Sequence, residues 1–168
     1  NVIKGQKDYY DVTKAFHNML HDSTIKPYTT YTKMFDIFNR CNNYNCDNMS
    51  MDFDYNFIHD QQPIGLIESE LKVKVYQKNI WRCHIDISNP NPIIWSFLND
   101  YHKYYDESIY SMQHFAPKSN VPQHIIRPSN DPLTDKNIEL SDSKIDKVLN
   151  KFEIIRDKPT IVQVSRFD

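Results

Sequence analysis

The sequence predicts an α/β fold in which a Rossmann-like parallel sheet is flanked by helices. Two observations lead to this prediction. Short apolar runs that end in polar residues alternate with segments of helical periodicity, which is the pattern of strands and helices in a parallel sheet. The 168 residues include 39% hydrophobic and 13% aromatic side chains, enough to bury one ordinary core. We therefore expect one main domain.

The N-terminal part of the chain carries two predicted helices followed by a loop. Apolar residues at helical spacing predict the first helix over residues 11–21, and they are Val12, Ala15, Phe16, Met19 and Leu20. The second helix is expected over residues 28–40. Residues 41–52 (CNNYNCDNMSMD) are rich in Asn, Asp and Ser, whose side chains bond to nearby backbone in turns. We expect an exposed loop there.

Four short apolar segments are the predicted strands of the sheet. They span residues 55–58, 79–83, 108–112 and 124–126. A helix is expected after the second strand, because Asn91 can cap it and Pro92 suits the first helical position. Apolar residues then recur on one helical face, namely Ile94, Phe97, Leu98, Tyr101 and Tyr105.

The C-terminal part of the chain is predicted to hold one more helix and one more strand. Ser141 or Ser143 can cap a helix with an inner, core-facing side. That side consists of Ile145, Val148, Leu149 and Phe152. Residues 153–158 read as a linker, and the apolar run at residues 160–164 after Pro159 predicts a strand.

Polar residues that follow the strands are the candidate site. In open α/β sheets, ligands bind outside the carboxyl ends of the strands, so residues just past several strands converge on one crevice. The candidates are His59, Asp60, His84, Asp86, His114, Asp131 and Arg166. Imidazole and carboxylate groups bind sugar hydroxyls, and the guanidinium of arginine suits phosphate. The set indicates a polar, phosphorylated ligand.

Each candidate also has a purely structural interpretation. His59 and Asp60 can cap the segment that follows them, and Asp131 before Pro132 can form a turn. Arg166 can be a solvated residue at a strand end. For His84, a buried histidine with satisfied hydrogen bonds and a ligand contact are equally good interpretations. The residues taken singly leave these alternatives open.

Composition excludes several classes of partner. The net charge is −2 and both signs are mixed along the chain, so we expect no nucleic-acid partner. The sequence has no apolar run of about 20 residues and no signal-peptide pattern, which predicts a cytoplasmic protein without a membrane partner. Its three cysteines suggest neither a disulfide framework nor a zinc site. His and Asp residues lack the spacing of a metal motif, so no metal is expected.

One segment carries a specific motif. Residues 80–91 (IWRCHIDISNPN) resemble the signature segment of the trehalose glycosyltransferring synthases. Further matching segments occur in the same order along the chain: residues 12–14 (VTK), 58–63 (IHDQQP), 128–133 (PSNDPL) and 163–168 (QVSRFD). The resemblance covers nearly the whole chain.

The resemblance implies a fold, and with it a division of the chain. The family belongs to the retaining family-four glycosyltransferases, whose GT-B architecture places two Rossmann-like domains face to face. On this basis residues 1–152 are a partial N-terminal, acceptor-side domain. Residues 153–168 are the linker and the first strand of the C-terminal, donor-side domain. The low count of two glycines is consistent with a glycine-rich phosphate loop outside this chain.

The resemblance also implies roles for individual residues. His84 is implied as the active-site histidine beside the transferred sugar, and Arg166 as a ligand of the donor phosphate. Substrate binding is implied for Asp60, Arg82, Asp86 and Asp131. The implied partners are nucleoside diphosphate glucose with glucose or trehalose, and no cofactor is implied. Uncovered apolar faces make a homo-oligomer a further hypothesis.

Three functional interpretations stay open at this stage. The chain can be part of a glycosyltransferase, a non-catalytic remnant or sugar-binding domain, or part of a trehalose phosphorylase. Gln61 stands where the family has proline, and Arg127 and Asn130 replace expected apolar residues. These departures concern the identity of the acceptor sugar more than the fold. Because half of the cleft is expected elsewhere, the chain alone is expected to be inactive.

Overall fold

The computed structural model describes residues 2–50, 53–68, 77–134 and 136–155, together with residues 159, 161 and 163. The chain divides into two compact units, Asn1–Pro128 and Ser129–Asp168. Each unit is described by itself. The domain boundary expected after residue 152 stays a prediction.

The first unit contains a four-stranded parallel sheet. Its strands are β1 (Tyr55–His59), β2 (Lys78–Arg82), β3 (Glu107–Tyr110) and β4 (Gln123–Ile125). They lie in the order β1-β2-β3-β4, and every neighbouring pair is parallel. All four predicted strands are present, with ends shifted by no more than two residues. The predicted α/β class with a parallel sheet is confirmed.

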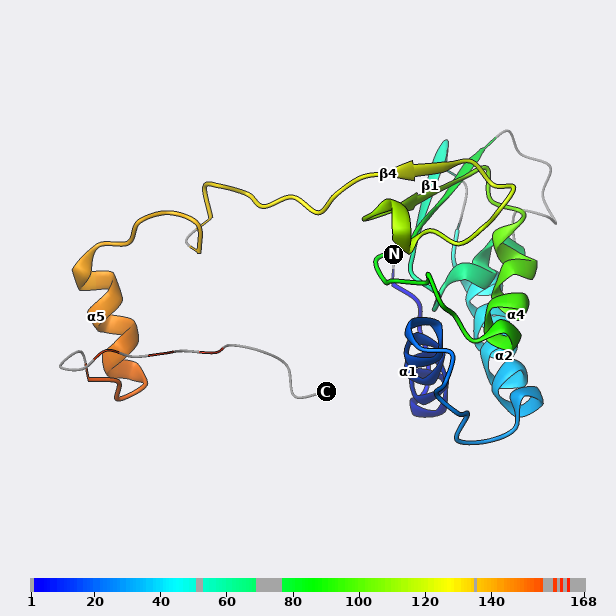
Figure 1. Ribbon diagram of the computed structural model, residues 1–168, viewed down its shortest axis with the longest axis horizontal. Coiled ribbons are helices and arrows are strands. Elements are labelled where there is room, and N and C mark those ends of the chain that lie inside the picture. Colours follow the sequence, from blue (N-terminus) through cyan, green and yellow to red (C-terminus); the bar gives the residue numbers. More distant parts are fainter. Residues whose placement is uncertain are drawn as a thin grey trace. The chain divides into compact units, whose positions relative to one another are not determined.

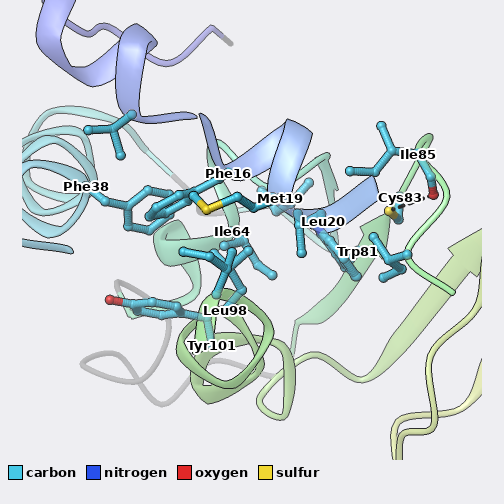
Figure 2. Packing of buried hydrophobic residues seen from close by; sticks show 14 of the residues in the cluster. Phe16, Met19, Leu20, Phe38, Ile64, Trp81, Cys83, Ile85, Leu98 and Tyr101 are labelled. Carbon is cyan, nitrogen blue, oxygen red and sulfur yellow. Dashed lines mark hydrogen bonds between the residues drawn. The ribbon is translucent and has the colours of Figure 1, made fainter. Parts of the chain in front are cut away.

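Three helices lie on one side of this sheet (Figure 1). They are α1 (Lys7–His21), α2 (Tyr31–Asn48) and α4 (Pro92–His102). Side chains from the helices, from the 3-10 turn η1 (Ile64–Leu66) and from β2 meet in one apolar cluster (Figure 2). Among the described residues, no helix has both the length and the apolar character that crossing a bilayer requires.

Strand β1 alternates between a covered and an open face. In β1, Asn56 and Ile58 are buried, whereas Tyr55, Phe57 and His59 point the other way and are exposed. A groove of about 570 Å³ runs beside these exposed side chains. Alternation of this kind is expected for a strand with one face on the core.

Helix α4 forms as its sequence predicts. Oδ1 of Asn91 accepts hydrogen bonds from the backbone N–H groups of Ile93 and Ile94, at 3.0 and 3.3 Å, and Pro92 occupies the first turn. Such a cap satisfies backbone donors that the helix itself leaves unpaired. Helix α1 is also confirmed, although it begins four residues earlier than expected.

Helix α2 contradicts the predicted loop over residues 41–52, because it continues to Asn48. Asn42 and Asn45 are both 1% exposed, and their side chains bond to backbone from other segments. Nδ2 of Asn42 donates to the carbonyl of Gln62, and Asn45 accepts from the backbone N–H of Lys4 and donates to its carbonyl. These tertiary hydrogen bonds outweigh the low helix propensity of asparagine.

The second unit contains one described helix, α5 (Asp142–Lys151). Ser141 is its N-cap, but the serine side chain makes no capping hydrogen bond. The expected inner side is not buried, since Val148 is 49% and Phe152 62% exposed. Among the described residues of this unit, α5 has no other helix or strand to pack against. The predicted strand over residues 160–164 lies outside them.

Replacement of Asn45 tests the contacts that keep α2 helical. Asn45→Ala removes the partner of the Lys4 backbone N–H and leaves the Lys4 carbonyl only the Cys41 thiol, at part-buried contacts, and we expect the free energy of unfolding to fall by about 1–3 kcal/mol. Asn43→Ala is the matched control, because Asn43 is exposed on the same helix. Urea unfolding measures both. Equal stability of the two variants would contradict a stabilising role for the Asn45 contacts.

Replacement of His102 tests a buried imidazole in α4. The ring is fully buried beside Trp81 and Trp95, and burial lowers its pKa from 6.5 to about 4. The unfolded chain therefore binds a proton near pH 6.5 and the folded chain only near pH 4. Stability should fall as the pH drops through this window, by about 3 kcal/mol in total. Thermal unfolding of His102→Phe should show a smaller loss, and an identical pH profile in both proteins would refute this.

Candidate functional site

The candidate site lies where β1 and β2 end. His59 is the last residue of β1 and pairs in register with Arg82, the last residue of β2. Asp60 follows β1 directly, and His84 stands two residues after β2. Because the two strands are parallel neighbours, these residues meet although 24 residues separate Asp60 from His84 in the sequence. The structure thus brings together three of the residues that the sequence singled out.

The imidazole rings of His59 and His84 contact each other. Nδ1 of His59 lies 2.9 Å from Nε2 of His84, and the ring planes differ by 13° with centroids 5.2 Å apart. Both side chains are exposed. At such a distance one nitrogen carries a hydrogen and the other accepts it. Each ring keeps its second nitrogen for another partner.

Asp60 joins the ends of the two strands. Its backbone N–H donates to the carbonyl of Arg82 at 2.8 Å, and its own carbonyl accepts from Nε1 of Trp81 at 2.8 Å. Its carboxylate accepts from the backbone N–H of His84 at 2.9 Å. Asp60 adopts a φ of 63°, in the left-handed region that aspartate tolerates better than most residues. These three hydrogen bonds hold that conformation in place.

The backbone around His84 is anchored on both sides. Cys83 and Ile85 are 1% and 9% exposed, and both belong to the core cluster (Figure 2). The N–H of Cys83 also donates to the carbonyl of Ile109. Burial raises the pKa of the Cys83 thiol to about 12, so this cysteine is no nucleophile at neutral pH. His84 is therefore an exposed side chain on a fixed stretch of backbone.

The side chain of Arg82 makes its described hydrogen bonds with residues just past β3 and β4. Its side chain is buried, and Nη2 donates to the Ser111 hydroxyl at 3.3 Å and to the carbonyl of Ile126 at 2.9 Å. It ties the end of β2 to the residues that follow β3 and β4. Within the described residues Nη1 has no hydrogen-bond partner. Substrate binding by Arg82 stays a prediction.

Asp86 belongs to a second group of polar residues near the first. Burial raises the pKa of its carboxyl group, but hydrogen bonds from Ser88 and the charges of His114 and His21 outweigh burial, and the pKa is lowered. The 3-10 turn η2 (Gln113–Phe115) contacts this loop through a hydrogen bond from the N–H of Ile87 to the carbonyl of Phe115. Asp86 is thus ionised at neutral pH, and its role in substrate binding stays a prediction.

The two remaining predicted residues lie beyond the first unit. Asp131 is in the second unit, where Oδ1 accepts from the N–H of Leu133 and the carbonyl accepts from the N–H of Thr134. These contacts form the turn that its structural interpretation proposed. Arg166 lies outside the described residues. Substrate binding by Asp131 and phosphate binding by Arg166 stay predictions.

The sequence did not reveal the direct contact between His59 and His84 or the bond from Trp81 to Asp60. Taken singly, His59 and Asp60 fit a capping role as well as a place in the site. The signal that could have found the contact is the predicted parallel register, because it places the ends of two neighbouring strands side by side. The indole bond depends on a side-chain direction that no spacing rule specifies.

Substitutions at Asp60 separate its hydrogen bond from its backbone conformation. Asp60→Asn keeps an acceptor oxygen and tolerates the left-handed region, so we expect the unfolding free energy to change by less than about 0.5 kcal/mol. Asp60→Ala loses the acceptor and is strained, at a cost of about 2 kcal/mol. Asp60→Gly loses the acceptor alone and should lie between them. Urea unfolding gives the order, and a glycine variant less stable than the alanine variant would contradict it.

Comparison with known proteins reveals the relatives of this chain. The family described as "Trehalose synthase, N-terminal domain" matches residues 1–117. The trehalose synthase of Thermococcus litoralis is 38% identical over 170 residues, which cover 99% of this chain and 40% of that protein. The trehalose synthase of Pyrococcus furiosus shows the same values. That of Rubrobacter xylanophilus is 31% identical over 169 residues, or 99% of this chain and 41% of the relative.

The match includes the sheet from β1 to β3 and the residues at the carboxyl ends of β1 and β2. His59, Asp60 and His84 all fall within it, whereas Asp131 lies beyond it. The chain spans about two fifths of the length of these relatives. The resemblance inferred from the motifs is confirmed, and the chain belongs to the family of the trehalose synthase N-terminal domain.

Proposed function

We propose that this chain is the acceptor-side part of a retaining glycosyltransferase that makes trehalose. The complete protein would transfer a glucosyl group from nucleoside diphosphate glucose to glucose. The observation that carries this proposal is the exposed His84 ring, held at the carboxyl ends of two parallel strands in a segment similar to trehalose synthases. Ligands of open α/β folds bind at that edge of the sheet.

His84 would act by binding a hydroxyl group of the transferred glucose. A hydrogen bond to that hydroxyl orients the sugar ring as its anomeric carbon loses the diphosphate and gains positive charge. Asp60 serves this role indirectly, because its carboxylate holds the His84 backbone. Arg166 would neutralise the departing phosphate, because a guanidinium group carries a permanent positive charge. The chemistry needs no metal or cofactor in this proposal.

The chain by itself is proposed to be inactive. It spans about two fifths of the length of its relatives, so these 168 residues correspond to less than half of a complete enzyme of this kind. Rate enhancement requires groups that bind the transition state more tightly than the substrate, and these must surround the reacting atoms. An isolated wall of a cleft leaves the sugar and the phosphate largely in water, and transfer should be negligible.

A chimera tests the proposal. The chain replaces the matched segment of the Thermococcus litoralis trehalose synthase, and trehalose formation is measured with nucleoside diphosphate glucose and glucose. We expect the chimera to form trehalose and the isolated chain to form none. His84→Ala in the chimera should lower kcat/KM by about 100-fold, since a contact made to the reacting sugar is lost. His124→Ala is the control, because His124 is an exposed histidine of β4 and should change kcat/KM by less than about twofold.

The outcomes separate the proposal from its alternatives. Cleavage of trehalose that depends on inorganic phosphate, without transfer from the nucleotide sugar, would assign the segment to a phosphorylase. A folded chimera that carries out neither reaction would favour a non-catalytic domain. Unchanged activity of the His84→Ala chimera would refute the role given to His84. Transfer by the isolated chain would refute its proposed inactivity.

A further inference from the structure

We propose that His59 is a positioning residue for His84. Its imidazole accepts the hydrogen on Nε2 of His84, and His84 therefore presents an unprotonated Nδ1 to a hydroxyl group of the sugar. This inference rests on the proposed function of His84 and deepens it. It assigns the direction of the sugar hydrogen bond, with the hydroxyl as donor and the imidazole as acceptor.

The two rings touch through specific nitrogen atoms. The contact joins Nδ1 of His59 to Nε2 of His84 at 2.9 Å. Two bare ring nitrogens would repel each other at this distance, so one of them carries a hydrogen. Which nitrogen carries it determines the state of the far nitrogen of each neutral ring. The tautomers of the two rings are therefore linked.

The pair of neutral rings has two linked tautomeric states. If His84 donates, both rings carry their hydrogen on Nε2, which is the form that a free neutral histidine side chain prefers. If His59 donates, both rings carry it on Nδ1, so both adopt the less favoured form. The hydrogen bond is the same in length and type in both states. The intrinsic preference of two rings therefore adds up, and it favours His84 as the donor.

The contact with His59 also restricts the orientation of the His84 ring. Its backbone is fixed by the carboxylate of Asp60 and by the buried residues Cys83 and Ile85 on either side. Rotation about the side-chain bonds remains, and the hydrogen bond to the nearly coplanar ring of His59, whose plane differs by 13°, restricts it. No other hydrogen bond to the His84 ring occurs among the described residues. Loss of His59 would leave the backbone of His84 in place but would free its ring to rotate. The rate of a reaction that needs aligned groups would then fall.

Imidazole NMR of the whole 168-residue chain tests the assignment without any enzyme assay. With histidine labelled by nitrogen-15, at neutral to mildly alkaline pH, we expect the His84 hydrogen on Nε2. We also expect a coupling across the hydrogen bond between that nitrogen and Nδ1 of His59. A hydrogen found on Nδ1 of His59 would overturn the acceptor role of His84. A folded spectrum without any coupling between the two rings would overturn the pairing itself.

A matched pair of substitutions tests the positioning role in the chimera described above. His59→Asn keeps an acceptor oxygen at the place of Nδ1, whereas His59→Leu has a similar shape without an acceptor. We expect the leucine variant to lower kcat about 10-fold with little change in KM, and the asparagine variant to stay within about threefold of the parent. Equal losses in both would show a packing role and overturn the proposal. If the parent chimera makes no trehalose, the proposed function fails, while the NMR result still decides the pairing.

Discussion

The parallel pairing of β1 with β2 is the interaction on which the candidate site depends. Its register runs from Tyr55 opposite Lys78 to His59 opposite Arg82, and the N–H of Asp60 extends the ladder by one more bond to the Arg82 carbonyl. This alignment is stabilised by burial of one face of both strands against the helices, where Trp81 is 1% exposed. A shift of one residue would turn that face to solvent and would separate the two histidines.

Much of the fold could be predicted from local patterns, because those patterns report which residues are buried. Strands β1 to β4 and helices α1 and α4 follow from apolar spacing and from the cap at Asn91. The last turns of α2 could not be predicted in this way, since their asparagines bond to backbone far away in the sequence. The exposed side of α5 shows the converse, because periodicity identifies an apolar side without identifying what covers it.

The sequence predicted the location of the site in the fold but not the contacts between its residues. The rule that ligands bind at the carboxyl ends of parallel strands selected His59, Asp60 and His84. Their actual relation depends on strand register and on the left-handed backbone of Asp60, neither of which is visible in residue types alone. Asp86 was selected by the same rule and Arg82 by the motif, and their described hydrogen bonds are made to residues of their own unit.

The asparagine contacts of α2 also bear on how the molecule opens. Asn45 bonds to both backbone groups of Lys4, and Nδ2 of Asn42 bonds to the carbonyl of Gln62, the same carbonyl that accepts from the hydroxyl of Tyr9. The start of the chain, the end of α2 and the loop after β1 therefore share hydrogen bonds. Amide groups in these three segments should exchange with solvent in one cooperative opening event instead of fraying separately. That opening would also release the backbone just beyond Asp60, so solvent exchange in a distant helix would report on the integrity of the site.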